Sequence, residues 1–145
     1  MEKTPAIAQL RAAIENTLVA QRGYRGEIKK WKRKYLKGLD GRPLHVRSLH
    51  SALNLLLQSA GALICKKWIV LVENNLIRAG YDHGKDFQFM VWCHDELQIA
   101  CRNKEIAEDV LRIAQNSMRE SQSYFRFRVQ LDVDGKIGRN WCDCH

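Results

Sequence analysis

The sequence predicts an α+β protein in which short antiparallel strands pack on long helices. Residues 49–78 form the longest helical pattern of the chain. Two runs rich in aromatic and β-branched residues, 86–93 and 97–102, indicate strands joined by a short turn. The second half then follows the order strand, turn, strand, helix, strand, which is typical of an antiparallel α+β layout.

The first predicted element is a helix over residues 4–23. Thr4 suits the capping position, Pro5 suits the first turn, and Gly23 suits the end. Its apolar residues recur at helical spacing and are expected to form one buried face. They are Ile7, Leu10, Ile14 and Leu18.

Residues 24–47 are expected to contain a hairpin and most of the positive charge. Asp40-Gly41 is a hairpin signal, and Pro43 favours an edge position for the second strand. Residues 1–47 carry twelve Lys and Arg against four Asp and Glu, a net charge of +8, whereas residues 48–145 are neutral. The basic residues expected to contact a polyanion are Lys29, Lys30, Lys32, Arg33, Lys34, Arg42 and Arg47.

Two interpretations of this basic segment stay open on composition. In one, phosphates attract the cations, and Trp31 and Tyr35 stack on bases. In the other, the segment is a solvated basic helix whose aromatic side chains join the core.

The long helix is predicted to begin after Ser48 and to end near Gly80. Most of it is apolar, but His50, Asn54 and Gln58 recur every four residues. At about 100° per residue they share one narrow face. This polar ridge faces either solvent or a hydrogen-bonding partner.

The turn between the two predicted strands holds the polar residues His94, Asp95 and Glu96. A carboxylate on a rigid hairpin is a good ligand for a hard cation such as Mg²⁺. The alternative is an ordinary polar surface turn. Beyond it, Asn103 is predicted to cap a second amphipathic helix, and residues 125–133 are predicted to form a final strand.

The stretches "VWCHDELQIACRNKEIAEDVLRIAQNSM", "KWKRKYLKGLDGRPLHVRSLHSALNLLLQSAGALICKKW" and "LDVDGKIGRNWCDCH" resemble family A DNA polymerases, of the replicative type of short-tailed lytic bacteriophages. The resemblance implies an incomplete polymerase palm, with residues 1–47 resembling the end of the fingers and residues 48–145 the C-terminal half of the palm. "HDE" resembles motif C of that family.

By this resemblance Asp95 is a catalytic metal ligand, His94 contacts the primer end, and Glu96 is the neighbouring acid. Gln58 and Asn54 match residues that face the DNA minor groove, whose acceptors occur in every base pair. His50 stands where an arginine is common elsewhere in the family, so its DNA contact is the least secure of the three.

The same resemblance implies two Mg²⁺ ions, primer-template DNA and deoxynucleoside triphosphates in the cytoplasm of a bacterial host or phage-infected cell. The resemblance places motif A, with its pattern Asp-x-Ser-x-x-Glu, and motif B upstream of these stretches, and neither is found in residues 1–47. We therefore expect that the chain alone does not polymerise DNA. It is either one part of a split polymerase that needs a complementary chain, or an inactive remnant.

Other classes of function compete with this interpretation. A non-catalytic DNA-binding module explains the basic segment but not the "HDE" turn. A zinc site at Cys142, Cys144 and His145 has cramped spacing, and "DVDGKIGRN" lacks the glutamate that closes a calcium loop. No apolar run reaches the length of a membrane span and no signal peptide is visible, so an intracellular protein with reduced cysteines and no membrane partner is expected.

Overall fold

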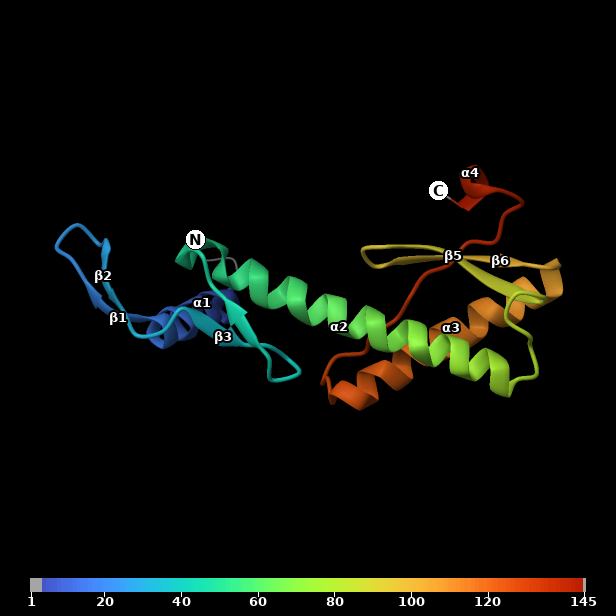
Figure 1. Ribbon diagram of the computed structural model, residues 1–145, viewed down its shortest axis with the longest axis horizontal. Coiled ribbons are helices and arrows are strands. Elements are labelled where there is room, and N and C mark those ends of the chain that lie inside the picture. The colour runs from blue at the N-terminus through green and yellow to red at the C-terminus, as the bar shows by residue number, and fades with distance from the viewer. Residues whose placement is uncertain (1–3, 145) are drawn as a thin grey trace. The chain divides into compact units, whose positions relative to one another are not determined.

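The computed structural model describes residues 4–144, and it confirms the mixed α+β class (Figure 1). The chain divides into two compact units, which we call unit 1 (Met1–Leu63) and unit 2 (Ile64–His145). The boundary falls inside one long helix, α2 (Leu49–Arg78). Each unit is described below by itself.

Unit 1 contains one short helix, two antiparallel hairpins and the first part of α2. β1 pairs with β2 and β3 pairs with β4. The predicted Asp40-Gly41 hairpin is confirmed as the β3–β4 turn, where Gly41 adopts a left-handed φ of 87°. The elements are α1 (Pro5–Leu18), β1 (Val19–Arg22), β2 (Ile28–Trp31), β3 (Tyr35–Lys37) and β4 (Pro43–His45).

The predicted end of the first helix at Gly23 is wrong, because α1 ends at Leu18. Residues 19–22 instead pair with β2, so their backbone groups are satisfied by a ladder rather than by a further helical turn. Gly23 lies in the β1–β2 turn, where its N–H donates to the Glu27 carbonyl at 2.8 Å. Pro5 lies in the first turn as predicted, but the Thr4 side chain makes no capping hydrogen bond.

The basic segment is not a helix. Lys29 and Lys30 belong to β2, and Lys32 and Arg33 follow that strand. Trp31 is half-buried against the core of unit 1, which agrees with the second interpretation for this one aromatic side chain. The buried members of that core are Ile14, Leu18, Leu36, Val46 and Ala52.

α2 begins and ends where the sequence predicts. The Ser51 N–H donates to the Ser48 hydroxyl at 3.3 Å, and Gly80 follows the helix with a left-handed φ of 93°. Its 30 residues are long and apolar enough, by length and composition, to cross a membrane, with a mean hydropathy of 1.6 over the best window. The expectation that no apolar run reaches the length of a membrane span is therefore corrected. One such helix is weak evidence for a membrane span, because the core helix of a soluble protein passes the same test.

Unit 2 packs the second part of α2 and the helix α3 with a third hairpin. Its elements are β5 (Phe87–Cys93), β6 (Glu96–Cys101), α3 (Lys104–Phe125) and α4 (Trp141–Cys144). The predicted cap of α3 is confirmed, because Asn103 Oδ1 accepts from the Ile106 N–H at 2.9 Å.

The core of unit 2 lies between α2, α3 and the hairpin. The Trp68 indole N–H crosses from α2 to donate to the Ala114 carbonyl of α3 at 2.8 Å. The buried members of this core are Trp68, Val72, Leu76, Phe87, Ile106, Val110, Ile113, Ala114 and Met118. The hairpin is thereby anchored at its base, where Phe87 is buried.

The final strand predicted over residues 125–133 is wrong. Phe125 is still part of α3, and Arg126 ends that helix in the left-handed conformation. The following segment lies against α3, whose side chains replace a strand as hydrogen-bond partners. Gln122 Oε1 accepts from the Leu131 N–H at 2.9 Å, and the Gln115 amide donates to the Val133 carbonyl at 3.4 Å. The polar–apolar alternation reflects burial of Leu131 and Val133 against the core, not a ladder.

Candidate active site

The three polar residues of the predicted turn meet at the tip of the β5–β6 hairpin, in unit 2. Cys93 pairs with Glu96, so the turn consists of His94 and Asp95, and Glu96 is the first residue of β6. His94 has a φ of 55°, a left-handed conformation that is uncommon for a residue with a side chain. The tight turn therefore presents Asp95 in one defined backbone setting.

Asp95 and Glu96 have different surroundings. Asp95 is exposed, whereas Glu96 is half-buried and accepts a hydrogen bond from the side-chain amide of Gln98. Beneath the hairpin, burial raises the pKa of the Cys65 thiol of α2, and the negative charge of Asp95 adds to this effect. The effect of Asp95 on the pKa of Cys65, within unit 2, places the carboxylate within electrostatic reach of α2.

These residues fit a divalent cation in part. Carboxylate oxygens are the ligands that Mg²⁺ prefers, and Mg²⁺ is commonly held by one or two carboxylates together with substrate phosphates. The exposed oxygens of Asp95 meet that need, and Glu96 is the adjacent candidate. Within residues 4–144, however, no cluster of three or more His, Cys, Asp or Glu side chains has the arrangement of a metal site. The carboxylates that this hairpin offers to a cation are those of Asp95 and Glu96.

The hairpin also contains two residues that the sequence did not single out. The indole N–H of Trp92 donates to the His94 carbonyl at 2.8 Å, and Gln98 holds Glu96 as described above. The only indication of them in the sequence is that Trp92 lies two residues before His94 and Gln98 lies two residues after Glu96. Nothing in residue spacing indicates these bonds, because they depend on the turn geometry.

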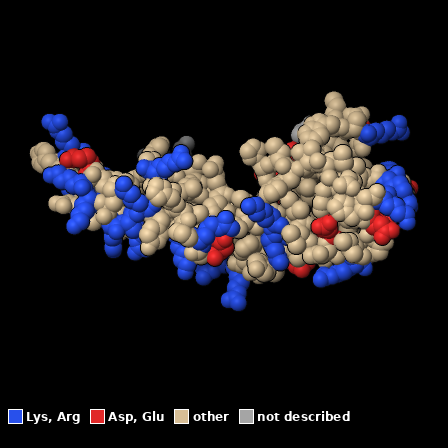
Figure 2. Space-filling view, viewed as in Figure 1, with Lys and Arg blue, Asp and Glu red and all other residues tan. Residues whose placement is uncertain are grey.

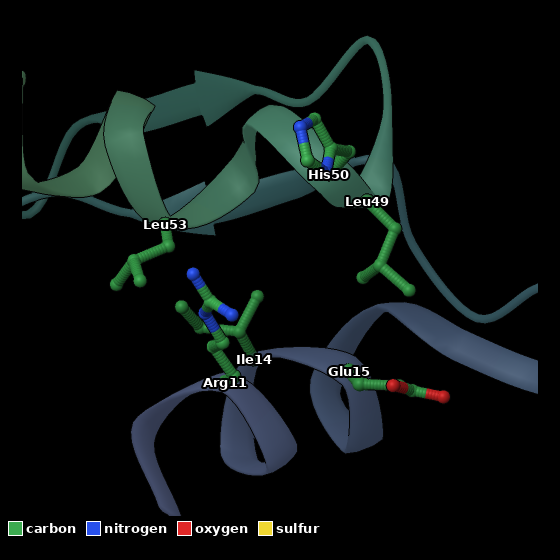
Figure 3. A pocket seen from close by; sticks show the side chains of 6 residues that line it. All are labelled: Arg11, Ile14, Glu15, Leu49, His50 and Leu53. Carbon is green, nitrogen blue, oxygen red and sulfur yellow. The ribbon is translucent and has the colours of Figure 1, made fainter. Parts of the chain in front are cut away.

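The polar ridge of α2 lies in unit 1. His50, Asn54 and Gln58 are all exposed, in agreement with their shared face on the helix. His50 lines a hollow of about 310 Å³ between α1 and the start of α2 (Figure 3). The other residues around this hollow are Arg11, Ile14, Glu15, Leu49 and Leu53.

The basic residues predicted to contact DNA are exposed on unit 1. Figure 2 shows Lys and Arg side chains gathered over the part of the chain that carries the first two hairpins. Asp40 pairs with Arg42 at 2.5 Å, and the Arg42 guanidinium holds the pKa of that carboxyl below its usual value. The Arg33 guanidinium lies 5.8 Å from the centre of the Tyr35 ring. The exposed set is Lys29, Lys30, Lys32, Arg33, Lys34, Arg42 and Arg47.

The C-terminal segment gives no support to the zinc or calcium alternatives within the described residues. The five cysteines are free thiols, and Cys144 contacts the Lys136 carbonyl, with 3.8 Å between Sγ and O. His145 lies outside the described residues. Asp132 accepts hydrogen bonds from its neighbour Val133 and from Arg119, which lower its pKa.

Comparison with known proteins identifies the family of the chain. Residues 1–143 match the model of DNA polymerase family A. The whole chain is 54% identical to the DNA-directed DNA polymerase of Enterobacteria phage T3 and 53% identical to that of Escherichia phage T7, and it covers 21% of each. It is 29% identical over 71% of its length to DNA polymerase I of Aquifex aeolicus, of which it covers 17%. The chain thus spans about a fifth of the length of these relatives, and it belongs to DNA polymerase family A.

Proposed function

We propose that this chain supplies the motif C part of a nucleotidyl-transfer site in a DNA-directed DNA polymerase. The observation that carries the proposal is the exposed Asp95 in the two-residue turn of an antiparallel hairpin, in a chain of this family. Residues 48–145 would form the C-terminal half of the palm, and residues 1–47 the end of the fingers.

The residues of the hairpin tip divide the work. Asp95 holds Mg²⁺, with Glu96 as the second candidate ligand, and His94 contacts the primer end. When bound, two such ions activate the attacking hydroxyl and neutralise the leaving pyrophosphate. Because this hairpin offers too few oxygens for both ions, a carboxylate from a motif A segment must face Asp95. That segment, with motif B, lies in a complementary chain or in a longer form of this one.

Unit 1 would contact the primer-template DNA. The exposed amides of Asn54 and Gln58 can donate to minor-groove acceptors, which all base pairs present, so such contacts report base-pair geometry rather than sequence. His50 lies on the same face. The cations of the β1–β2 and β3–β4 hairpins suit phosphate contacts, because the whole formal net charge of +8 belongs to residues 1–47. The reaction would take place in the cytoplasm of a phage-infected bacterial cell.

A chimera tests the catalytic part of the proposal. This chain replaces the matched region of the phage T7 relative, and primer extension is measured with Mg²⁺ and all four deoxynucleotides. The chimera should extend the primer, and Asp95→Asn should lower the rate by about 1,000-fold or more, because metal ions supply several kcal/mol of transition-state stabilisation.

Glu108→Ala is the matched control, since it removes an exposed carboxylate of α3 that pairs with Lys104 at 3.6 Å. It should leave the rate within about twofold. An inactive parent chimera, or an Asp95→Asn chimera that keeps more than a tenth of the rate, contradicts the proposal. The isolated 145-residue chain should show no extension above background, and robust extension would exclude the need for a complementary segment.

A further inference from the structure

The β5–β6 hairpin changes register just before its tip. Phe89 pairs with Ile99, whereas Val91 pairs with Gln98, so Met90 is an extra residue on β5. Such a bulge reverses the alternation of side chains beyond it. Without it, residue 92 would face away from Phe87 and Phe89.

The bulge brings Trp92 opposite Leu97, a residue of the face that packs on the core of unit 2. Trp92 nevertheless stays 43% exposed, because the pair lies near the end of the hairpin, beyond the main core. Packing therefore fixes the position of its ring less than one polar contact does. That contact is the hydrogen bond from the indole N–H to the His94 carbonyl at 2.8 Å.

The accepting carbonyl belongs to the residue with the least favourable backbone in the turn. His94 has a φ of 55°, which is uncommon for any residue with a side chain. A donor aimed at this carbonyl favours the left-handed conformation over competing turns. His94 directly precedes Asp95, so its backbone conformation sets the direction in which the chain enters Asp95.

We propose that Trp92 is a positioning residue, whose indole N–H keeps His94 in the left-handed conformation and so orients Asp95 for a divalent cation. The bulge at Met90 determines the face on which Trp92 lies, and the Trp92 hydrogen bond then stabilises the backbone conformation of His94. The metal-binding consequence rests on the proposed function, whereas the effect on the turn does not.

The test uses the isotopically labelled 145-residue chain. The one-bond coupling between the α carbon and the α proton of His94 distinguishes positive from negative φ, and broadening of the amide signals of residues 95–97 by Mn²⁺ reports cation binding. Trp92→Phe keeps an aromatic ring and removes the donor. It should change the His94 coupling and raise the Mn²⁺ concentration for half-maximal broadening about fivefold, as expected when one hydrogen bond is removed.

Two further variants separate positioning from general destabilisation. Trp141→Phe, an exposed tryptophan of α4, should leave both readouts unchanged. His94→Asn introduces a residue that tolerates the left-handed conformation, so Trp92→Phe in that background should change the Mn²⁺ midpoint by less than about twofold. An equal effect of Trp92→Phe in both backgrounds overturns the proposal, even if the variant is less stable.

Failure of this inference is distinguishable from failure of the proposed function. If Trp92→Phe leaves the coupling of residue 94 unchanged, the positioning role is wrong, whatever happens to Mn²⁺. If Asp95→Asn leaves the Mn²⁺ broadening unchanged, the metal-ligand role of Asp95 is wrong, while the coupling still decides the role of Trp92.

Discussion

Unit 1 and unit 2 use the same kinds of elements for different purposes. Unit 1 holds the excess positive charge, two small hairpins, and a core whose buried members are all aliphatic. Unit 2 is neutral overall, and its core includes Trp68 and Phe87, which bury more surface per residue. The difference is that unit 1 carries the exposed cations on small hairpins, whereas unit 2 packs its hairpin on a core with large aromatic side chains.

The largest expected effect tests the core of unit 2. Leu76→Ala removes a side chain with 0% exposure and should lower the free energy of unfolding by about 2–5 kcal/mol. Ile77→Ala, the next residue on the same helix, is 53% exposed and should cost less than about 1 kcal/mol. Urea unfolding followed by circular dichroism measures both. Equal losses would contradict the placement of the core.

The second test asks whether the cations of unit 1 meet phosphates. Replacing Lys30 and Lys32 by Gln should reduce the slope of log K against log salt concentration, by about 0.9 for each phosphate of duplex DNA that the variant no longer neutralises. Lys85→Gln with Lys104→Gln removes the same charge from unit 2, and it should leave the slope unchanged. Fluorescence anisotropy over a salt series measures the slopes. The same slope in both variants would mean that binding follows total charge alone.

A third test compares the beginnings of two helices. Asn103→Ala removes the side chain that caps α3 in unit 2, and should cost about 1 kcal/mol of unfolding free energy. Thr4 stands at the equivalent position before α1 in unit 1, where its side chain makes no capping hydrogen bond. Thr4→Ala should therefore lower the free energy of unfolding by much less. Thermal unfolding of the two variants decides this. A larger loss for Thr4→Ala would show that α1 is capped in solution.

The smallest expected effect is the pH dependence of stability that a surface carboxylate of unit 2 contributes. Hydrogen bonds from Tyr81 and then Arg112 lower the pKa of Asp109 below its usual 3.8. This carboxylate therefore stabilises the fold above about pH 4, and the contribution is lost as pH falls through the lowered folded value.

Asp109→Asn should consequently be less stable than the parent chain at about pH 6, with the difference shrinking as pH falls below 3.8. The urea midpoint across this range is the measurement. Glu108→Gln, at the neighbouring exposed position, serves as the control. A difference that grows on acidification would reverse the predicted sign.

Local chemistry made several elements predictable. Both ends of α2 were recognisable from single residues. The Ser48 hydroxyl accepts a hydrogen bond from a backbone N–H of the first turn. Gly80 adopts the left-handed backbone conformation that ends the helix. The same holds for Asn103 at α3 and for the Asp40-Gly41 turn. The hairpin carrying His94 and Asp95 followed from the two flanking strand patterns.

Two wrong predictions of secondary structure concern where a segment finds its hydrogen-bond partners. Residues 19–22 continue a helical pattern, yet they pair with β2. Residues 125–133 alternate like a strand, yet side chains of α3 satisfy part of their backbone. Partner choice depends on which groups the rest of the fold brings near, and no local pattern contains that information.

The sequence by itself therefore determined the α+β class, the long helix, the concentration of charge in the first third and the residues of the "HDE" turn. These follow from spacing, capping and composition, which act between near neighbours. Only the tertiary structure decided the division into two units, the different surroundings of Asp95 and Glu96, and the bond from Trp92 to His94. Those depend on strand register and on packing between distant segments, where a single extra residue at Met90 changes which face a side chain takes.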